Sequence, residues 1–244
     1  MYRAILALTA LTCAAAASAS AAPRPSPVPF VGCASDGQTG PEPAPKTPAH
    51  MPAVTGPEAG KLAYYESSAL GVLAPRGWRC FGLYGSNGSI LIVTPEAHED
   101  DLFEPGPGLK GPAVQLSVSA SDTSGRFEVA DVAARLFPSR KAYVEGVIAE
   151  GIEPRSRFHF RPFPTDTIRR YGEDAVEFET PANTVGMGTK SRLVPNGDPI
   201  RGLAMMTSKN DLVLLAVRVP TDQRDLATTI MGSVRQAKAS FAAE

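Results

Sequence analysis

Alternating apolar and polar residues predict β-strands along much of the chain. In residues 114–120, Val and Leu alternate with Gln and Ser, which is typical of a strand that is buried on one face only. The Asn87-Gly88 pair lies between two apolar runs and is the strongest local signal for a tight hairpin. Residues 212–219 form the most apolar run and predict a central strand. Further strands are expected at residues 70–74, 78–84, 90–94, 155–160, 168–171, 175–180 and 200–207.

Apolar residues at helical spacing predict three helices. Two of them are expected at residues 129–136 and 143–148, where Pro138 and Gly151 mark the ends. The third carries an apolar stripe over residues 226–241, and we expect Thr221 to be its N-cap. Hairpins combined with segregated helices predict an α+β fold, in which a mostly antiparallel β-sheet is covered by helices.

The order of these elements resembles the PsbP-like fold over roughly residues 66–241. The resemblance rests on "LGVLAPRGW" at 70–78, on the hairpins that follow, and on "LAVRVPTDQRDLATTIMGSV" at 215–234. The N-terminal pattern "GCASDGQTGP" at 32–41 is also similar to a family of secreted bacterial proteins. The resemblance implies an α/β/α sandwich whose last helix follows the central strand. It also implies a non-enzymatic role in assembly or binding.

Residues 1–21 have the features of a secretory signal peptide. Arg3 is the only charge among the first 23 residues, and an apolar run and an alanine-rich stretch follow it. We expect cleavage after Ala21, although Ala19 also fits. Cys13 matches a lipoprotein signal poorly, because Thr12 stands where a small residue is usual. We therefore predict a periplasmic or secreted protein, with no transmembrane segment, since no apolar run approaches the roughly 20 residues that span a bilayer.

Cys33 and Cys80 are the two cysteines that remain after the signal peptide. An even number of cysteines in an exported chain predicts a disulfide bond. A zinc site is disfavoured, because neither cysteine has a second Cys or a His at ligand spacing. We therefore predict a Cys33–Cys80 bridge that fastens the N-terminal arm to the domain.

Composition divides the mature chain into an arm and a domain. Residues 22–60 are rich in proline and poor in large aliphatic side chains, which predicts an extended or polyproline-like spacer. Residues 61–244 are predicted to form a single α+β domain.

Charge excludes some classes of partner. The full chain has 24 basic and 25 acidic residues, and loss of residues 1–21 removes one arginine, which gives a net charge of −2. This near-balance argues against nucleic acid or an anionic membrane as a partner.

Motifs for cofactors and metals are also weak. Residues 186–191 (GMGTKS) lack the glycines of a phosphate-binding loop. His98 precedes three acidic residues that we interpret as a solvated loop rather than a metal site. We therefore expect no cofactor and no metal.

The segment "RSRFHFRPF" contains the candidate binding residues. If residues 155–160 form a strand, Arg157, His159 and Arg161 share one face, while Phe158 and Phe160 face the core. The basic face is a candidate anion-binding surface. The alternative is a solvated face that pairs with glutamates on neighbouring strands.

The sequence favours an exported, non-enzymatic binding or envelope-assembly module, and no catalytic residue is predicted. Its partner is expected to be an envelope protein or a small ligand. The alternative is a periplasmic hydrolase whose serine, histidine and acid meet only in the folded chain. A deep pocket that holds His98 or His159 beside a serine and an acid would support the hydrolase.

Overall fold

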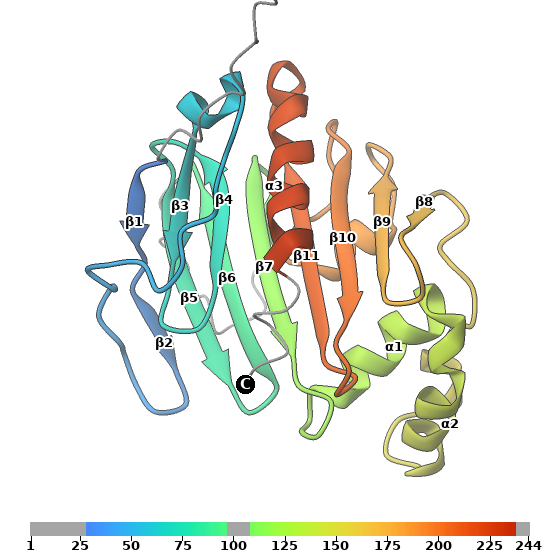
Figure 1. Ribbon diagram of the computed structural model, residues 1–244. Coiled ribbons are helices and arrows are strands. Elements are labelled where there is room, and N and C mark those ends of the chain that lie inside the picture. The colour runs from blue at the N-terminus through green and yellow to red at the C-terminus, as the bar shows by residue number, and fades with distance from the viewer. Residues whose placement is uncertain (1–27, 97–107, 238–244) are drawn as a thin grey trace, which may run out of the picture.

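The computed structural model describes residues 28–96 and 108–237, which form a mixed α+β structure of eleven strands and three α-helices. The eight-stranded sheet has the order β2-β5-β6-β7-β11-β10-β9-β8, and a second sheet has the order β1-β3-β4 (Figure 1). The predicted signal peptide, its cleavage site, Cys13 and the His98 loop lie outside the described residues.

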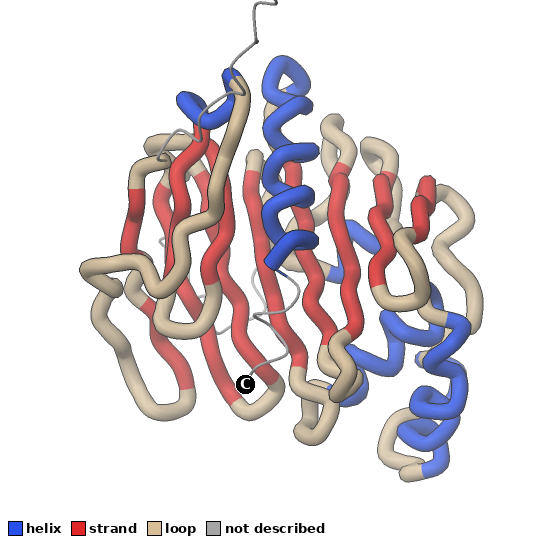
Figure 2. Tube along the Cα trace, viewed as in Figure 1, coloured by secondary structure: helices blue, strands red, loops and turns tan. Residues whose placement is uncertain are grey.

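The helices and strands have the following bounds. The larger sheet consists of β2 (Ser35–Gly37), β5 (Arg79–Gly85), β6 (Gly88–Thr94), β7 (Ala113–Ser119), β8 (Thr167–Arg170), β9 (Ala175–Thr180), β10 (Ile200–Met206) and β11 (Leu212–Arg218). The smaller sheet consists of β1 (Phe30–Gly32), β3 (Leu62–Glu66) and β4 (Gly71–Pro75). The helices are α1 (Arg126–Leu136), α2 (Lys141–Ala149) and α3 (Arg224–Gln236), and Figure 2 shows how they lie against the strands.

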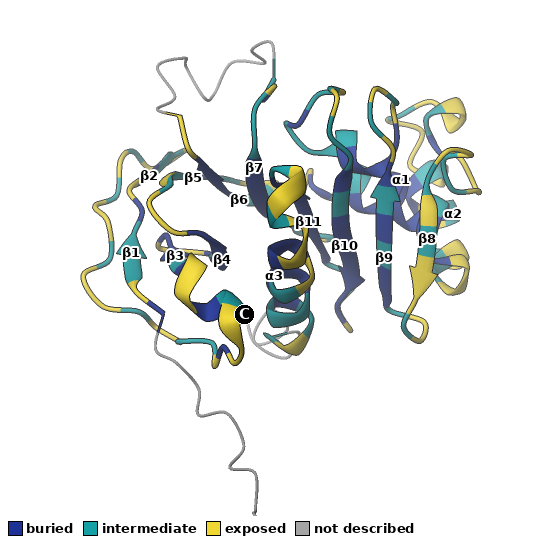
Figure 3. Ribbon diagram, turned by 90° about the horizontal axis from the view of Figure 1, so that it is seen from above, coloured by how far each residue is buried: buried dark blue, intermediate teal, exposed yellow. Residues whose placement is uncertain are grey.

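The two faces of the larger sheet are covered differently. On one face α3 and the smaller sheet pack together, around residues such as Leu116 and Leu215. On the other face α1 and α2 lie over β9, β10 and β11, where Phe178 and Leu214 join their core (Figure 3). Residues alternate between the faces of a strand, so Leu214 and Leu215 belong to different cores. The part of the second face formed by β5, β6 and β7 lies beside these helices.

The central hairpin agrees with the sequence prediction. β5 and β6 are antiparallel and meet at the Gly85–Gly88 pair. Gly88 has φ of 134°, and a Cβ there would lie 1.9 Å from the carbonyl oxygen of Val118 on β7. Only glycine fits this conformation and this close approach. β11, the most apolar run, is buried along its whole length and is the fifth of eight strands, as predicted.

The predicted strand at residues 155–160 is wrong. Arg155–Arg157 form a 3₁₀ turn, and residues 158–160 are not in a strand. Prolines stand at 154, 162 and 164, and proline cannot donate a ladder hydrogen bond. Phe158 is buried whereas Phe160 is 43% exposed, so the two phenylalanines do not share a core face. Arg157, His159 and Arg161 therefore do not share one face of a strand, as the predicted anion-binding surface requires.

Thr221 is not the N-cap of α3. It begins a short 3₁₀ turn after Pro220, and α3 starts at Arg224. The Thr221 hydroxyl donates instead to Oδ1 of Asp198 over 3.4 Å. A 3₁₀ turn of three residues, Thr221–Gln223, thus separates Pro220 from the start of α3.

The proline-rich arm contributes strands that the sequence analysis missed. β1 pairs in parallel with β3, and β2 pairs in parallel with β5, so the described part of the arm belongs to both sheets and is not a spacer. The Cys33–Cys80 disulfide, with an S–S distance of 2.05 Å, links the arm to β5 as predicted. None of the helices within the described ranges is both long and apolar enough to cross a bilayer.

Candidate functional site

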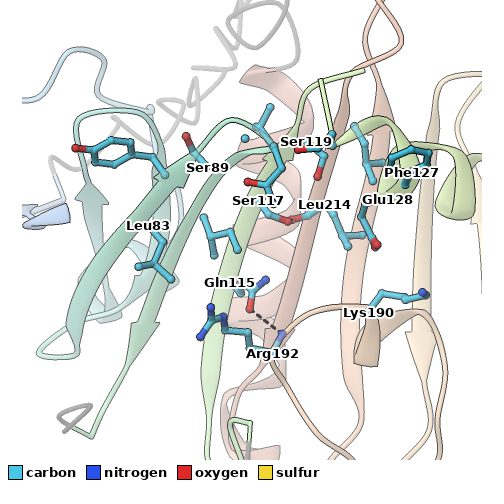
Figure 4. A pocket seen from close by; sticks show the side chains of 18 of the residues that line it. Leu83, Ser89, Gln115, Ser117, Ser119, Phe127, Glu128, Lys190, Arg192 and Leu214 are labelled. Atoms are coloured by element: carbon cyan, nitrogen blue, oxygen red, sulfur yellow. Dashed lines mark hydrogen bonds between the residues drawn. The ribbon is translucent and has the colours of Figure 1, made fainter. Parts of the chain in front are cut away.

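A cavity of about 580 Å³ lies on the sheet face that carries α1 and α2. Its floor comes from β5, β6, β7 and β11, and its walls come from the start of α1 and residues 190–192 (Figure 4). The cavity thus combines segments that are distant in the sequence. Its size is within the range of about 300–1,000 Å³ that is usual for small-molecule sites.

Gly125 brings the first turn of α1 to this cavity. A Cβ at Gly125 would lie 2.3 Å from the carbonyl oxygen of Asn87 and 2.7 Å from that of Ala120. The helix can therefore begin against the β5–β6 hairpin only because residue 125 has no side chain. Phe127 and Glu128 follow directly and line the cavity wall.

The floor of the cavity combines apolar and polar side chains. Leu83, Ile90 and Leu214 line it from three strands. Two polar residues beside them, Ser117 and Gln115, already have partners in the protein. The Ser117 hydroxyl donates to the carbonyl oxygen of Leu214 over 3.2 Å, and Oε1 of Gln115 accepts from the backbone N–H of Arg192 over 2.9 Å. An apolar group could cover this floor without breaking those bonds.

Arg218 fixes the segment that forms the far wall. Its side chain is fully buried, and its guanidinium donates to the carbonyl oxygens of Leu109, Gly111 and Val194 over 2.5–3.0 Å. An isolated β-bridge joins Leu109 to Leu193 in the same place. The buried charge is thus satisfied by carbonyl dipoles, and it holds residues 192–194 against the sheet.

Three cations and one carboxylate line the cavity. Lys190 forms an ion pair with the buried Asp131 of α1, and Arg157 pairs with Glu153 over 2.6 Å. Burial raises the pKa of the Glu128 carboxyl above its usual value of 4.5, and the charge of Lys190 partly offsets this rise. Oε1 of Glu128 is buried and accepts no hydrogen bond from the described residues.

Arg192 is the lining cation that has no counter-charge within the described part of the chain. Its side chain is partly buried, and no carboxylate or carbonyl among the described residues accepts a hydrogen bond from its guanidinium. Burial lowers the pKa of this guanidinium below its usual value, because the charged form loses hydration. In Figure 4 Arg192 lies beside Gln115 on the side of Leu83, whereas Lys190 and Glu128 lie together on the opposite side.

The buried Glu128 gives a pH-dependent prediction. Its pKa is higher in the folded than in the unfolded chain, so the folded state binds the proton more tightly and loses stability as the pH rises above about 4.5. We expect Glu128→Gln to match the wild type near pH 4 and to be more stable than the wild type at pH 8. Urea unfolding at both pH values measures this difference.

Glu145→Gln is the matched control for that experiment. A side-chain hydrogen bond from Arg155 lowers the pKa of the exposed Glu145 carboxyl, so this variant should show no gain in stability at pH 8. A Glu128→Gln variant that is equally destabilised at pH 4 and pH 8 would contradict the prediction.

The residues of the predicted anion-binding surface are separated. Arg157 lines the cavity, whereas His159 and Arg161 are exposed and are not among its lining residues. Sequence reasoning missed Arg192 and Glu128. Two basic residues close together in "TKSR", Lys190 and Arg192, are a weak sequence signal for an anion-binding segment. No local pattern in the sequence marks Glu128 as buried.

The structure also locates the histidines that bear on the hydrolase alternative. Of the described histidines, His159 is exposed, and His50 lines a second cavity of about 690 Å³ on the opposite face of the sheet. In that second cavity, both carboxylate oxygens of Glu66 accept from the N–H of Ala49 over 3.1 Å, and Asp211 accepts from the N–H of Ser121 over 2.9 Å. The carboxylates of Glu66 and Asp211 therefore already have protein donors.

The chain was compared with protein-family models, with curated proteins and with solved structures, and no match was found in any of the three comparisons. The candidate site therefore rests on the geometry of this chain alone.

Proposed function

We propose that the chain is an exported, non-enzymatic binding protein whose cavity beside α1 holds a small ligand. The observation that carries this proposal is the apolar surface offered by Leu83, Ile90 and Leu214, beside which Ser117 and Gln115 are already paired. A preformed apolar cavity with few polar groups is typical of small-molecule sites. Of the two partner classes expected from the sequence, this geometry favours a small ligand over an envelope protein.

Two further parts of the proposal concern location and fold. Export through the signal peptide at residues 1–21 is supported by the Cys33–Cys80 disulfide, because such bonds persist in oxidising compartments. A PsbP-like sandwich is supported by the positions of α3 and α1 on opposite faces of the larger sheet.

Filling the cavity tests whether it is the binding site. The neutral apolar dye N-phenyl-1-naphthylamine is expected to bind the wild-type protein, with an increase in its fluorescence. Ser119 lines the cavity at the end of β7, and Ser119→Trp should reduce the affinity for the dye about tenfold, because the indole occupies the space.

The control is Thr228→Trp, which adds the same side chain to the exposed side of α3 on the other face. This variant should bind the dye as the wild type does. If the wild type does not bind the dye, or if both variants bind it equally well, the cavity is not the binding site.

A further inference from the structure

Arg192 stands out among the charged residues of the cavity because its guanidinium has no hydrogen-bond or ion-pair partner in residues 28–96 and 108–237. A partly buried cation loses hydration and needs hydrogen-bond acceptors to compensate. Within the described ranges its backbone N–H is bound by Gln115, but its side chain has no acceptor. Arg218 nearby is fully buried and has three carbonyl acceptors. A ligand is therefore expected to supply the hydrogen-bond acceptors that the Arg192 guanidinium needs.

The charge balance of the cavity restricts the charge of that ligand. Lys190 is neutralised by Asp131, and Arg157 is neutralised by Glu153. Glu128 adds a carboxylate on the side away from Arg192 (Figure 4). One cation is thus left for the ligand, and a carboxylate already in the wall disfavours a ligand with several negative charges.

The surroundings of Arg192 define the rest of the ligand. A guanidinium offers two parallel N–H donors that match the two oxygens of a carboxylate. Leu83, Ile90 and Leu214 supply apolar surface in the same cavity. In Figure 4 Leu83 lies on the side of Arg192, and Leu214 lies towards Phe127 and Glu128. A ligand that satisfies both parts has one anionic end and an apolar body.

We infer that the ligand of this cavity is a singly charged organic acid, whose carboxylate binds Arg192 and whose apolar body lies on Leu83, Ile90 and Leu214. This inference rests on the proposed function, since it names the ligand class of the same cavity. It differs from the sequence-based hypothesis, which placed an anion on Arg157, His159 and Arg161.

Displacement of N-phenyl-1-naphthylamine by three ten-carbon probes tests the ligand class. Decanoate should displace the dye at about a tenth of the concentration that decanol or decylamine requires. Arg192→Gln should weaken decanoate about tenfold or more, because it removes a hydrogen-bonded charge, and should leave decanol and the dye unchanged. The control Arg224→Gln removes an exposed charge at the start of α3 and should leave all three probes unchanged.

The outcomes separate this inference from the proposed function. If the dye binds in the cavity but decanoate and decanol displace it equally, or if Arg192→Gln does not weaken decanoate, the ligand class is wrong and the cavity remains a binding site. If the dye does not bind, both proposals fail. Unfolding midpoints of the two arginine variants within about 1 °C of the wild type confirm that affinity, and not folding, has changed.

Discussion

Replacing both Cys33 and Cys80 by alanine is expected to lower the free energy of unfolding by about 4 kcal/mol. The bridge joins residues 47 positions apart, so its loss releases a long loop in the unfolded chain. It also frees β2, a strand of only three residues that pairs with β5 alone within the larger sheet. Urea unfolding of the wild type and the double variant measures the change.

Wild-type protein reduced under denaturing conditions and refolded with dithiothreitol is the control for the cysteine variant. It should unfold at nearly the same urea concentration as the double variant, because both lack the bridge and alanine removes only the sulfur atoms in addition. A double variant with the midpoint of the oxidised wild type would show that the arm is held by its strand pairing alone.

Arg218→Met is expected to lower the free energy of unfolding by about 3 kcal/mol. Methionine fills a similar volume but donates no hydrogen bond, so the buried carbonyl oxygens of Gly111 and Val194 lose their donors. The segment that carries Arg192 should loosen as well. Hydrogen exchange at the amide of Val194, which donates to the carbonyl of Leu109, should therefore become faster in the variant.

Arg201→Met separates this effect from a general loss of positive charge. Arg201 lies on β10, and its guanidinium donates to the exposed Thr228 over 3.1 Å. Exposed contacts of this kind contribute little, so this variant should change the free energy of unfolding by less than about 1 kcal/mol. Equal effects at residues 201 and 218 would contradict the role given to the buried guanidinium.

Arg218 also shows why local patterns misjudge single residues. It ends the apolar run of β11, where a charge at a strand end is usually solvent-exposed. In the folded chain residues 109–111 and 192–194 cover this end of the strand and supply carbonyl acceptors. Those acceptors are over 20 residues away along the chain, so no window of the sequence contains them.

The error at residues 155–160 has a different cause. The alternation of Phe with Arg and His matched a half-buried strand, but the prolines at 154, 162 and 164 remove the donors that a ladder needs. The segment therefore does not form a strand, although the periodicity of its side chains predicted one. In residues 114–120 no proline interferes, and the same kind of pattern correctly predicted β7.

By itself the sequence determined the hairpins, the three helices, the central strand and the pairing of Cys33 with Cys80. These features depend on short-range periodicity, on the turn preference of Asn87-Gly88 and on the number of cysteines, all of which a single pass along the chain contains. The tertiary structure alone decided that Glu128, Lys190 and Arg192 line one cavity with Leu83. Their burial and their pairing depend on the close approach of α1 at Gly125 and on the carbonyl contacts of Arg218, which exist only when distant segments pack together.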